Sequence, residues 1–194
     1  MKRRVMYQVA MSADGHIAGP NGEHDWITMD PSIDFIAQCG QFDTAIMGRA
    51  TYAKTIAMHG DARLPGLETV VFSRTLSPGS AGGVTIVRED ARKVVFEMKR
   101  MTGRDIWLFG GGGLAGQLLE AGLIDTIDIA IMPVVLGKGT QLFETALPAT
   151  ILVADHVVLE NSGVVVIRYA AGDRLNGTPL INYVRRGDVD PGLV

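Results

Sequence analysis

The sequence predicts an α/β protein with a mixed, mostly parallel sheet, helices on both faces and an antiparallel hairpin near its carboxyl end. Over the first two thirds of the chain, short apolar segments typical of buried strands alternate with helical segments, and such alternation produces parallel strands joined by crossovers. After Gly139 the pattern changes to strand-like segments without helices between them. Asn161, Ser162 and Gly163 form the tight connection expected of a hairpin in that region.

The periodicity of apolar residues gives the expected elements in order. Strands are expected over residues 4–11, 44–47, 69–73, 84–87, 106–109, 127–132, 151–159, 164–170 and 180–184. Helices are expected over residues 31–39, 49–58, 90–101 and 114–122. Pro31 suits the first turn of its helix, where a missing N–H costs nothing. Residues 12–28 form a long loop rich in Gly, Asp, His and Asn.

Length and composition indicate one domain over residues 1–194 and exclude several classes of partner. A net charge of -3 gives no general attraction to nucleic acid or to acidic membranes. The chain has no signal-peptide pattern and no apolar run of the roughly 18 residues that a membrane span needs, so we expect a cytoplasmic protein. Its single cysteine, Cys39, is expected in the core. His16 and His24 lack further His or Cys ligands nearby, so no metal site is expected.

Four consecutive glycines, Gly110 to Gly113, separate the strand at 106–109 from the helix expected from Leu114. Glycine leaves backbone N–H groups bare at a helix N-terminus, where the helix dipole favours an anion. We interpret the segment as a phosphate cradle, and the alternative is that the glycines only permit tight packing. The spacing also fits GxGxxG, but a Rossmann domain is disfavoured because the motif lies past the middle of the chain and lacks the acidic residue expected about 20 positions later.

Two further strand ends carry groups suited to an anion. Gly48 permits close approach of a ligand, and Arg49 and Thr51 follow in the first turn of a helix, where a cation opposes the dipole unless an anion is present. Ser73 and Arg74 end the next strand. Two arginines at neighbouring strand ends could hold a phosphomonoester such as the 2′-phosphate of NADP. The alternatives are a surface salt bridge at Arg49 and an ordinary hairpin end at Arg74.

These motifs, taken in order, resemble the dihydrofolate reductase fold, and most of all the reductase domain of bacterial riboflavin biosynthesis, over about residues 4–185. The pieces that carry the resemblance are MSADGHIA (11–18), GEHDWIT (22–28), MGRATY (47–52), VFSR (71–74), FGGGG (109–113) and PVVLG (133–137). The resemblance implies that NADPH binds in extended form across the carboxyl edge of the sheet.

By motif, the resemblance also assigns parts of the cofactor to residues. It implies that Ala10 and Ala18 hold the nicotinamide carboxamide through backbone groups. The diphosphate contacts that it implies are Gly112, Gly113, Leu114 and Thr51. The 2′-phosphate and adenosine contacts that it implies are Arg49, Ser73 and Arg74. It further predicts a cis peptide bond between Gly110 and Gly111.

The residues expected around the hydride acceptor depart from the family pattern. Phe109 stands where the riboflavin reductase has Glu, Gln8 stands where it has Lys, and residues 31–39 lack its arginines. Asp34 is the candidate for proton delivery, with Asp30 one turn earlier. Trp26 in the long loop could cover the planar ring of the acceptor, or could simply pack beneath the loop.

The sequence therefore predicts an NADPH-dependent reductase of the riboflavin-biosynthesis type, related to 5-amino-6-(5-phosphoribosylamino)uracil reductases, acting on a small planar or carbonyl-like molecule. Dihydrofolate reduction and a non-catalytic NADPH-binding sensor are the alternatives. The strand-rich end of the chain could pair with a second copy, so we expect a homodimer.

Overall fold

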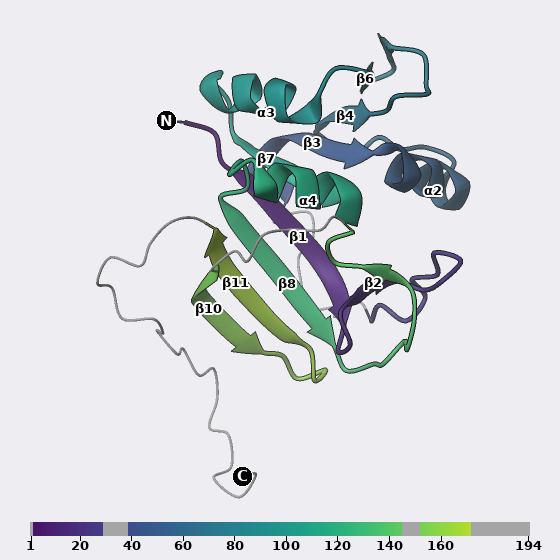
Figure 1. Ribbon diagram of the computed structural model, residues 1–194, viewed down its shortest axis with the longest axis vertical. Helices are drawn as coiled ribbons and strands as arrows, with labels where there is room; N and C mark the ends of the chain where they lie inside the picture. The colour runs from purple at the N-terminus through teal and green to yellow at the C-terminus, as the bar shows by residue number, and fades with distance from the viewer. Residues whose placement is uncertain (1, 29–38, 145–151, 172–194) are drawn as a thin grey trace, which may run out of the picture.

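The computed structural model describes residues 2–28, 39–144 and 152–171. The strands of its large sheet are β1 (Val5–Ser12), β3 (Phe42–Gly48), β4 (Glu68–Phe72), β5 (Gly79–Ala81), β6 (Val84–Val87), β7 (Asp105–Gly110), β8 (Thr126–Met132), β10 (Leu152–Leu159) and β11 (Val165–Ala171). A small second sheet pairs β2 (His16–Ala18) with β9 (Thr140–Gln141). The helices are α2 (Arg49–His59), α3 (Ala91–Arg100) and α4 (Gly112–Glu120) (Figure 1).

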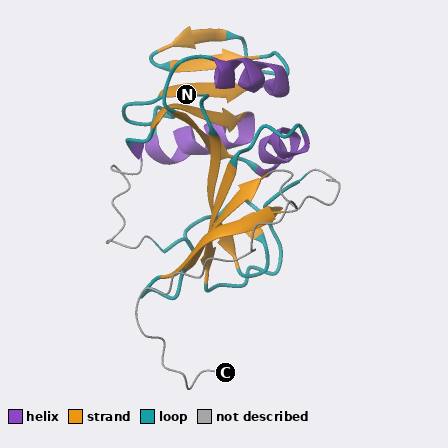
Figure 2. Ribbon diagram, turned by 90° about the vertical axis from the view of Figure 1, so that its left-hand side faces the viewer, coloured by secondary structure: helices purple, strands orange, loops and turns teal. Residues whose placement is uncertain are grey.

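The large sheet is mixed, with a parallel centre and antiparallel edges. Its strand order is β10-β11-β8-β1-β7-β3-β4-β6-β5. The pairs from β8 through β1, β7, β3 and β4 to β6 are all parallel, whereas β5 and the β10–β11 hairpin run antiparallel to their neighbours. The strands twist strongly between the two ends of the sheet (Figure 2). This architecture confirms the predicted fold class, including the carboxyl-terminal hairpin.

The helix after the glycines begins earlier than predicted. Gly110 ends β7 and Gly111 is the N-cap of α4, so Gly112 and Gly113 belong to the first helical turn and do not precede it. The first residue of this turn must be glycine for steric reasons, because a Cβ added to Gly112 would lie 2.6 Å from the backbone oxygen of Gln141. The short strands β2, β5 and β9 were not predicted. The helix expected at 31–39 lies outside the described residues except for Cys39, and the strand expected at 180–184 lies outside them entirely.

The two faces of the sheet carry separate hydrophobic cores. Side chains alternate along a strand, so Val5 and Tyr7 of β1 enter one core and Met6 enters the other. Residues of α3 and α4 complete the first core, on the face that these helices cover (Figure 1). Trp107 belongs to the second core, and Cys39 packs against it as expected. No helix within the described ranges is long and apolar enough to cross a membrane.

Strand β1 changes neighbours along its length. It pairs with β7 only from Val5 to Tyr7, but it remains paired with β8 as far as Ser12. The carboxyl half of β1 therefore parts from β7 close to the glycine-rich turn. Asp14 fixes the loop that follows, because its carboxylate accepts hydrogen bonds from the backbone N–H groups of Leu136 (3.0 Å) and Gly137 (2.7 Å).

Candidate functional site

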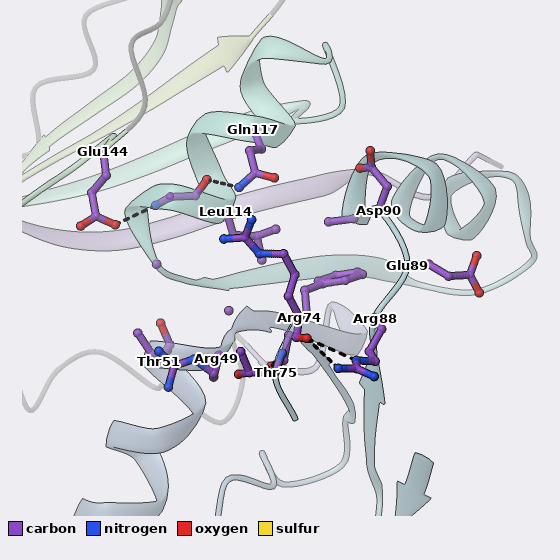
Figure 3. A pocket seen from close by; sticks show the side chains of 17 residues that line it. Arg49, Thr51, Arg74, Thr75, Arg88, Glu89, Asp90, Leu114, Gln117 and Glu144 are labelled. Carbon is purple, nitrogen blue, oxygen red and sulfur yellow. Dashed lines mark hydrogen bonds between the residues drawn. The ribbon is translucent and has the colours of Figure 1, made fainter. Parts of the chain in front are cut away.

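A cavity of about 750 Å³ opens at the carboxyl edge of the parallel strands. The ends of β3 and β4 reach it, as do the residue after β7, the first turns of α2 and α4 and the residues just before α3 (Figure 3). Eight of the predicted cofactor-binding residues line it: Gly48, Arg49, Thr51, Ser73, Arg74, Gly111, Gly113 and Leu114. The structure thus brings the three strand-end motifs together in one place.

Two helices point uncapped N-termini at this cavity. The N-cap of α2 is Gly48 and that of α4 is Gly111, and neither residue has a side chain to accept from the helix. By contrast, α3 is capped by Asp90, which accepts from the backbone N–H of Arg92. The first N–H groups of a helix have no partner within the helix and carry the positive end of its dipole. Two such ends at one cavity form a site suited to an anion.

Bare backbone at the glycines gives a ligand access to both helix ends. Gly110 has φ of 153°, which favours glycine, and its peptide bond to Gly111 is cis, as predicted. A Cβ added to Gly111 would lie 3.1 Å from Thr51 Oγ1. The Thr51 hydroxyl, which a ligand's phosphate oxygens could use as a donor, therefore sits beside the glycine turn. The residues present fit an extended anion that passes between α2 and α4.

Arginine side chains supply positive charge to the same cavity. Arg49 and Arg74 line it, and neither forms an ion pair within the part of the chain that the structure describes. The side chain of Arg74 extends toward the first turn of α4 (Figure 3). Arg88, which was not predicted, donates from Nε (3.3 Å) and Nη2 (2.9 Å) to the carbonyl oxygen of Arg74. The buried Ser73 hydroxyl accepts from the N–H groups that follow, which shapes the loop carrying Arg74.

Glu89, Asp90 and Glu144 also line the cavity, and the last two are engaged with other groups. Asp90 accepts hydrogen bonds from the Arg92 guanidinium and backbone N–H, and these lower the pKa of Asp90 to about 2. Glu144 accepts from the backbone N–H of Gly113 at 3.1 Å (Figure 3).

Gly110 and Gly112 flank Gly111 but do not themselves line the cavity, and three further predicted site residues lie elsewhere. Ala10 is half-buried on β1, opposite Ala130 of β8, and Ala18 is in β2. The indole N–H of Trp26 donates to the carbonyl oxygen of Glu23 at 3.1 Å. None of these three lines the cavity. Asp34 lies outside the described residues, as does Asp30.

Three residues that were not predicted from the sequence also line the cavity: Arg88, Gln117 and Glu144. Arg88 could have been found, since it directly follows a predicted strand in the same way that Arg74 does. Gln117 lies one turn into α4, and its side chain donates to the carbonyl oxygen of Gly113. Glu144 has no such signal, because only the tertiary fold brings its loop to the start of α4.

Comparison with known proteins yields matches along most of the chain. Residues 3–166 match the family described as the RibD C-terminal domain. The uncharacterized protein YyaP of Bacillus subtilis (strain 168) is 33% identical over 153 residues, which are 73% of this chain and 81% of that protein.

Solved structures show the same fold at lower identity. A putative riboflavin biosynthesis protein from Shewanella sp. PV-4 has a TM-score of 0.75 at 22% identity, with 89% of this chain and 99% of that chain covered. A diaminohydroxyphosphoribosylaminopyrimidine deaminase/5-amino-6-(5-phosphoribosylamino)uracil reductase from Thermotoga maritima has a TM-score of 0.65 at 14% identity, with 88% of this chain and 57% of that chain covered.

Proposed function

Because this chain belongs to the family of RibD C-terminal domains, we propose that it is an NADPH-dependent reductase acting on a small planar heterocycle. The observation that carries the proposal is the convergence of two uncapped helix N-termini and three arginines on one cavity. A dinucleotide with three phosphoryl groups matches that charge and those donors. NADPH, when bound, supplies the hydride, and the protein supplies position and electrostatics.

Each part of the cofactor has a proposed place along the carboxyl edge. The diphosphate lies between the first turns of α2 and α4, where Thr51 and the N–H groups of Gly112, Gly113 and Leu114 hold it. The 2′-phosphate lies at the end of β4, held by Ser73 and Arg74, with Arg49 nearby. The nicotinamide reaches Ala10 and Ala18, beyond the point where β1 parts from β7.

We propose an acceptor of the aminopyrimidine class, by analogy with the Thermotoga maritima reductase. One polar group on β1 near Ala10 is the amide of Gln8, which donates to Asp128 at 3.1 Å. Asp128 also accepts two hydrogen bonds from Arg168, so the Arg168 guanidinium is already paired with a carboxylate. These contacts favour recognition of the acceptor through its ring and not through a sugar phosphate. Trp26 is proposed to cover the ring, and Asp34 to deliver the proton.

Binding measurements with NADPH and NADH test the cofactor proposal. Arg74→Ala removes a charge-assisted contact to the 2′-phosphate, a contact worth about 1.5–3 kcal/mol. We expect NADPH affinity to fall roughly 10- to 100-fold and NADH affinity to stay unchanged. Arg100→Ala is the matched control, because Arg100 is exposed, pairs with Glu97 and lies away from the cavity. An equal fall in affinity for NADPH and NADH, or no fall in either, would contradict the assignment of Arg74 to the 2′-phosphate.

Turnover is tested separately by following NADPH oxidation with a panel of aminopyrimidines and dihydropterins. Oxidation with an aminopyrimidine supports the proposal, and oxidation with dihydrofolate alone would make the chain a dihydrofolate reductase. Tight NADPH binding without oxidation by any member of the panel would favour a sensor.

A further inference from the structure

The N-terminus of α4 already binds an anionic side chain of the protein itself, the carboxylate of Glu144. One carboxylate oxygen of Glu144 accepts from the Gly113 N–H at 3.1 Å, at the helix end whose N-cap residue, Gly111, has no side chain. A Cβ added to Gly113 would lie 3.4 Å from the same oxygen. Glu144 therefore occupies a donor that, under the proposed function, the cofactor's diphosphate must use.

The backbone beside Glu144 is anchored, whereas its side chain is free to turn away. Leu142 and Phe143 pack against the first core, and the Phe143 ring lies 6.1 Å from that of Tyr7, measured between centroids. Leu142 also donates its N–H to the carbonyl oxygen of Gly15. Glu144 itself is exposed, and the Gly113 contact is its only hydrogen bond within the described ranges. A rotation of this one side chain would free the helix end and leave the loop in place.

A carboxylate and a diphosphate cannot share one N–H donor, and at that distance their like charges repel. We propose that Glu144 competes with the cofactor's diphosphate for the N-terminus of α4 and thereby sets how tightly the dinucleotide is held. The inference rests on the proposed function, because it concerns the same site. In the free protein the carboxylate satisfies the helix end, and on binding it gives way to the phosphoryl oxygens. Glu144 is thus a determinant of affinity that weakens binding and favours release of the oxidised cofactor.

The test compares three probes on wild-type protein and on Glu144→Gln. NADP⁺ measures binding to the whole site, and inorganic pyrophosphate measures binding at the N-terminus of α4. Adenosine 2′-monophosphate measures binding only at the Arg74 end of the cavity. Removing the charge should raise the affinity for NADP⁺ and for pyrophosphate by about two- to fivefold, the size of an exposed charge contact with a helix end. Affinity for adenosine 2′-monophosphate should not change. Glu120→Gln is the matched control, since it removes the same charge from the exposed far end of the same helix.

The outcomes separate this inference from the proposed function. Unchanged or weaker NADP⁺ binding by Glu144→Gln would overturn the inference, and weaker binding would make Glu144 a ligand of the cofactor. An equal gain with Glu120→Gln would overturn it too, because the effect would then be one of net charge alone. If the wild-type protein binds neither NADP⁺ nor adenosine 2′-monophosphate, the proposed function is wrong. In that case the pyrophosphate measurement alone decides whether Glu144 competes with an anion for the N-terminus of α4.

Discussion

Gly112 and Gly113 are neighbours in the first turn of α4, yet they are glycines for different reasons. A Cβ on Gly112 would lie 2.6 Å from the Gln141 backbone oxygen and 3.1 Å from that of Leu142, and backbone cannot move aside cheaply. A Cβ on Gly113 would meet only the end of the Glu144 side chain, at 3.4 Å. Packing therefore requires the first glycine, whereas the second leaves space that a ligand can use.

The two alanine variants should consequently differ in stability. Gly112→Ala should lower the free energy of unfolding by about 1–3 kcal/mol through overpacking. Gly113→Ala should leave it unchanged or raise it by up to about 1 kcal/mol, because alanine is the better helix former. Urea denaturation of both variants beside wild type measures the difference. Equal destabilisation would show that the loop at 141–144 does not press on the start of α4 as described.

At the scale of elements, Asp14 joins the loop after β1 to the segment before β9. Its carboxylate accepts from the Ser12 hydroxyl (2.7 Å) and from the N–H groups of Leu136 and Gly137. The Ser12 bond, with the two backbone bonds, favours the ionised form and holds the pKa of Asp14 well below its usual range. The short strand β2, with Ala18, depends on this junction for its position.

A pH-dependent stability difference follows for Asp14→Asn. Since the pKa is lower in the folded state, ionised Asp14 stabilises the fold above its unfolded pKa of about 4. That contribution is lost as the pH falls further. An amide can accept through only one of its two atoms, so the variant should unfold at lower urea concentration at pH 7. The difference in unfolding free energy between the variant and wild type should narrow between pH 4 and pH 3. If that difference stays constant across this range, the charge of Asp14 does not have the proposed role.

How much could be predicted from the sequence also differs by element. The convergence of Gly48, Arg74 and Gly111 was predictable, because parallel strands end at one edge of a sheet and each motif directly follows a strand. Strands of two or three residues such as β2 and β9 carry no readable periodicity, and tertiary bonds to Asp14 fix their place. The position of Glu144 could not be predicted either, because tertiary packing of Leu142 and Phe143 against the core brings its loop to α4.

On the scale of the whole molecule, the two edges of the large sheet differ. The edge strand β5 has three residues, Gly79–Ala81, and a short edge offers little to another chain. The opposite edge, β10, has eight residues rich in valine and leucine. Leu159 at its end is 54% exposed. Within the described ranges no strand pairs with the outer side of β10. An apolar edge strand of this length is a template for pairing with another strand, so β10 is where we place the interface of the proposed homodimer.

Sedimentation at micromolar concentration tests this interface. Wild type should have twice the 20.8 kDa mass of the chain, and Leu159→Lys should shift it toward the monomer, because a lysine on an edge strand opposes pairing. The variant should keep its fold, since the side chain that it replaces is exposed. Met101→Lys is the control, as Met101 is 61% exposed just after α3 and belongs to neither edge. A monomeric wild type would refute the dimer, while a dimer that survives Leu159→Lys would place its interface away from this end of β10.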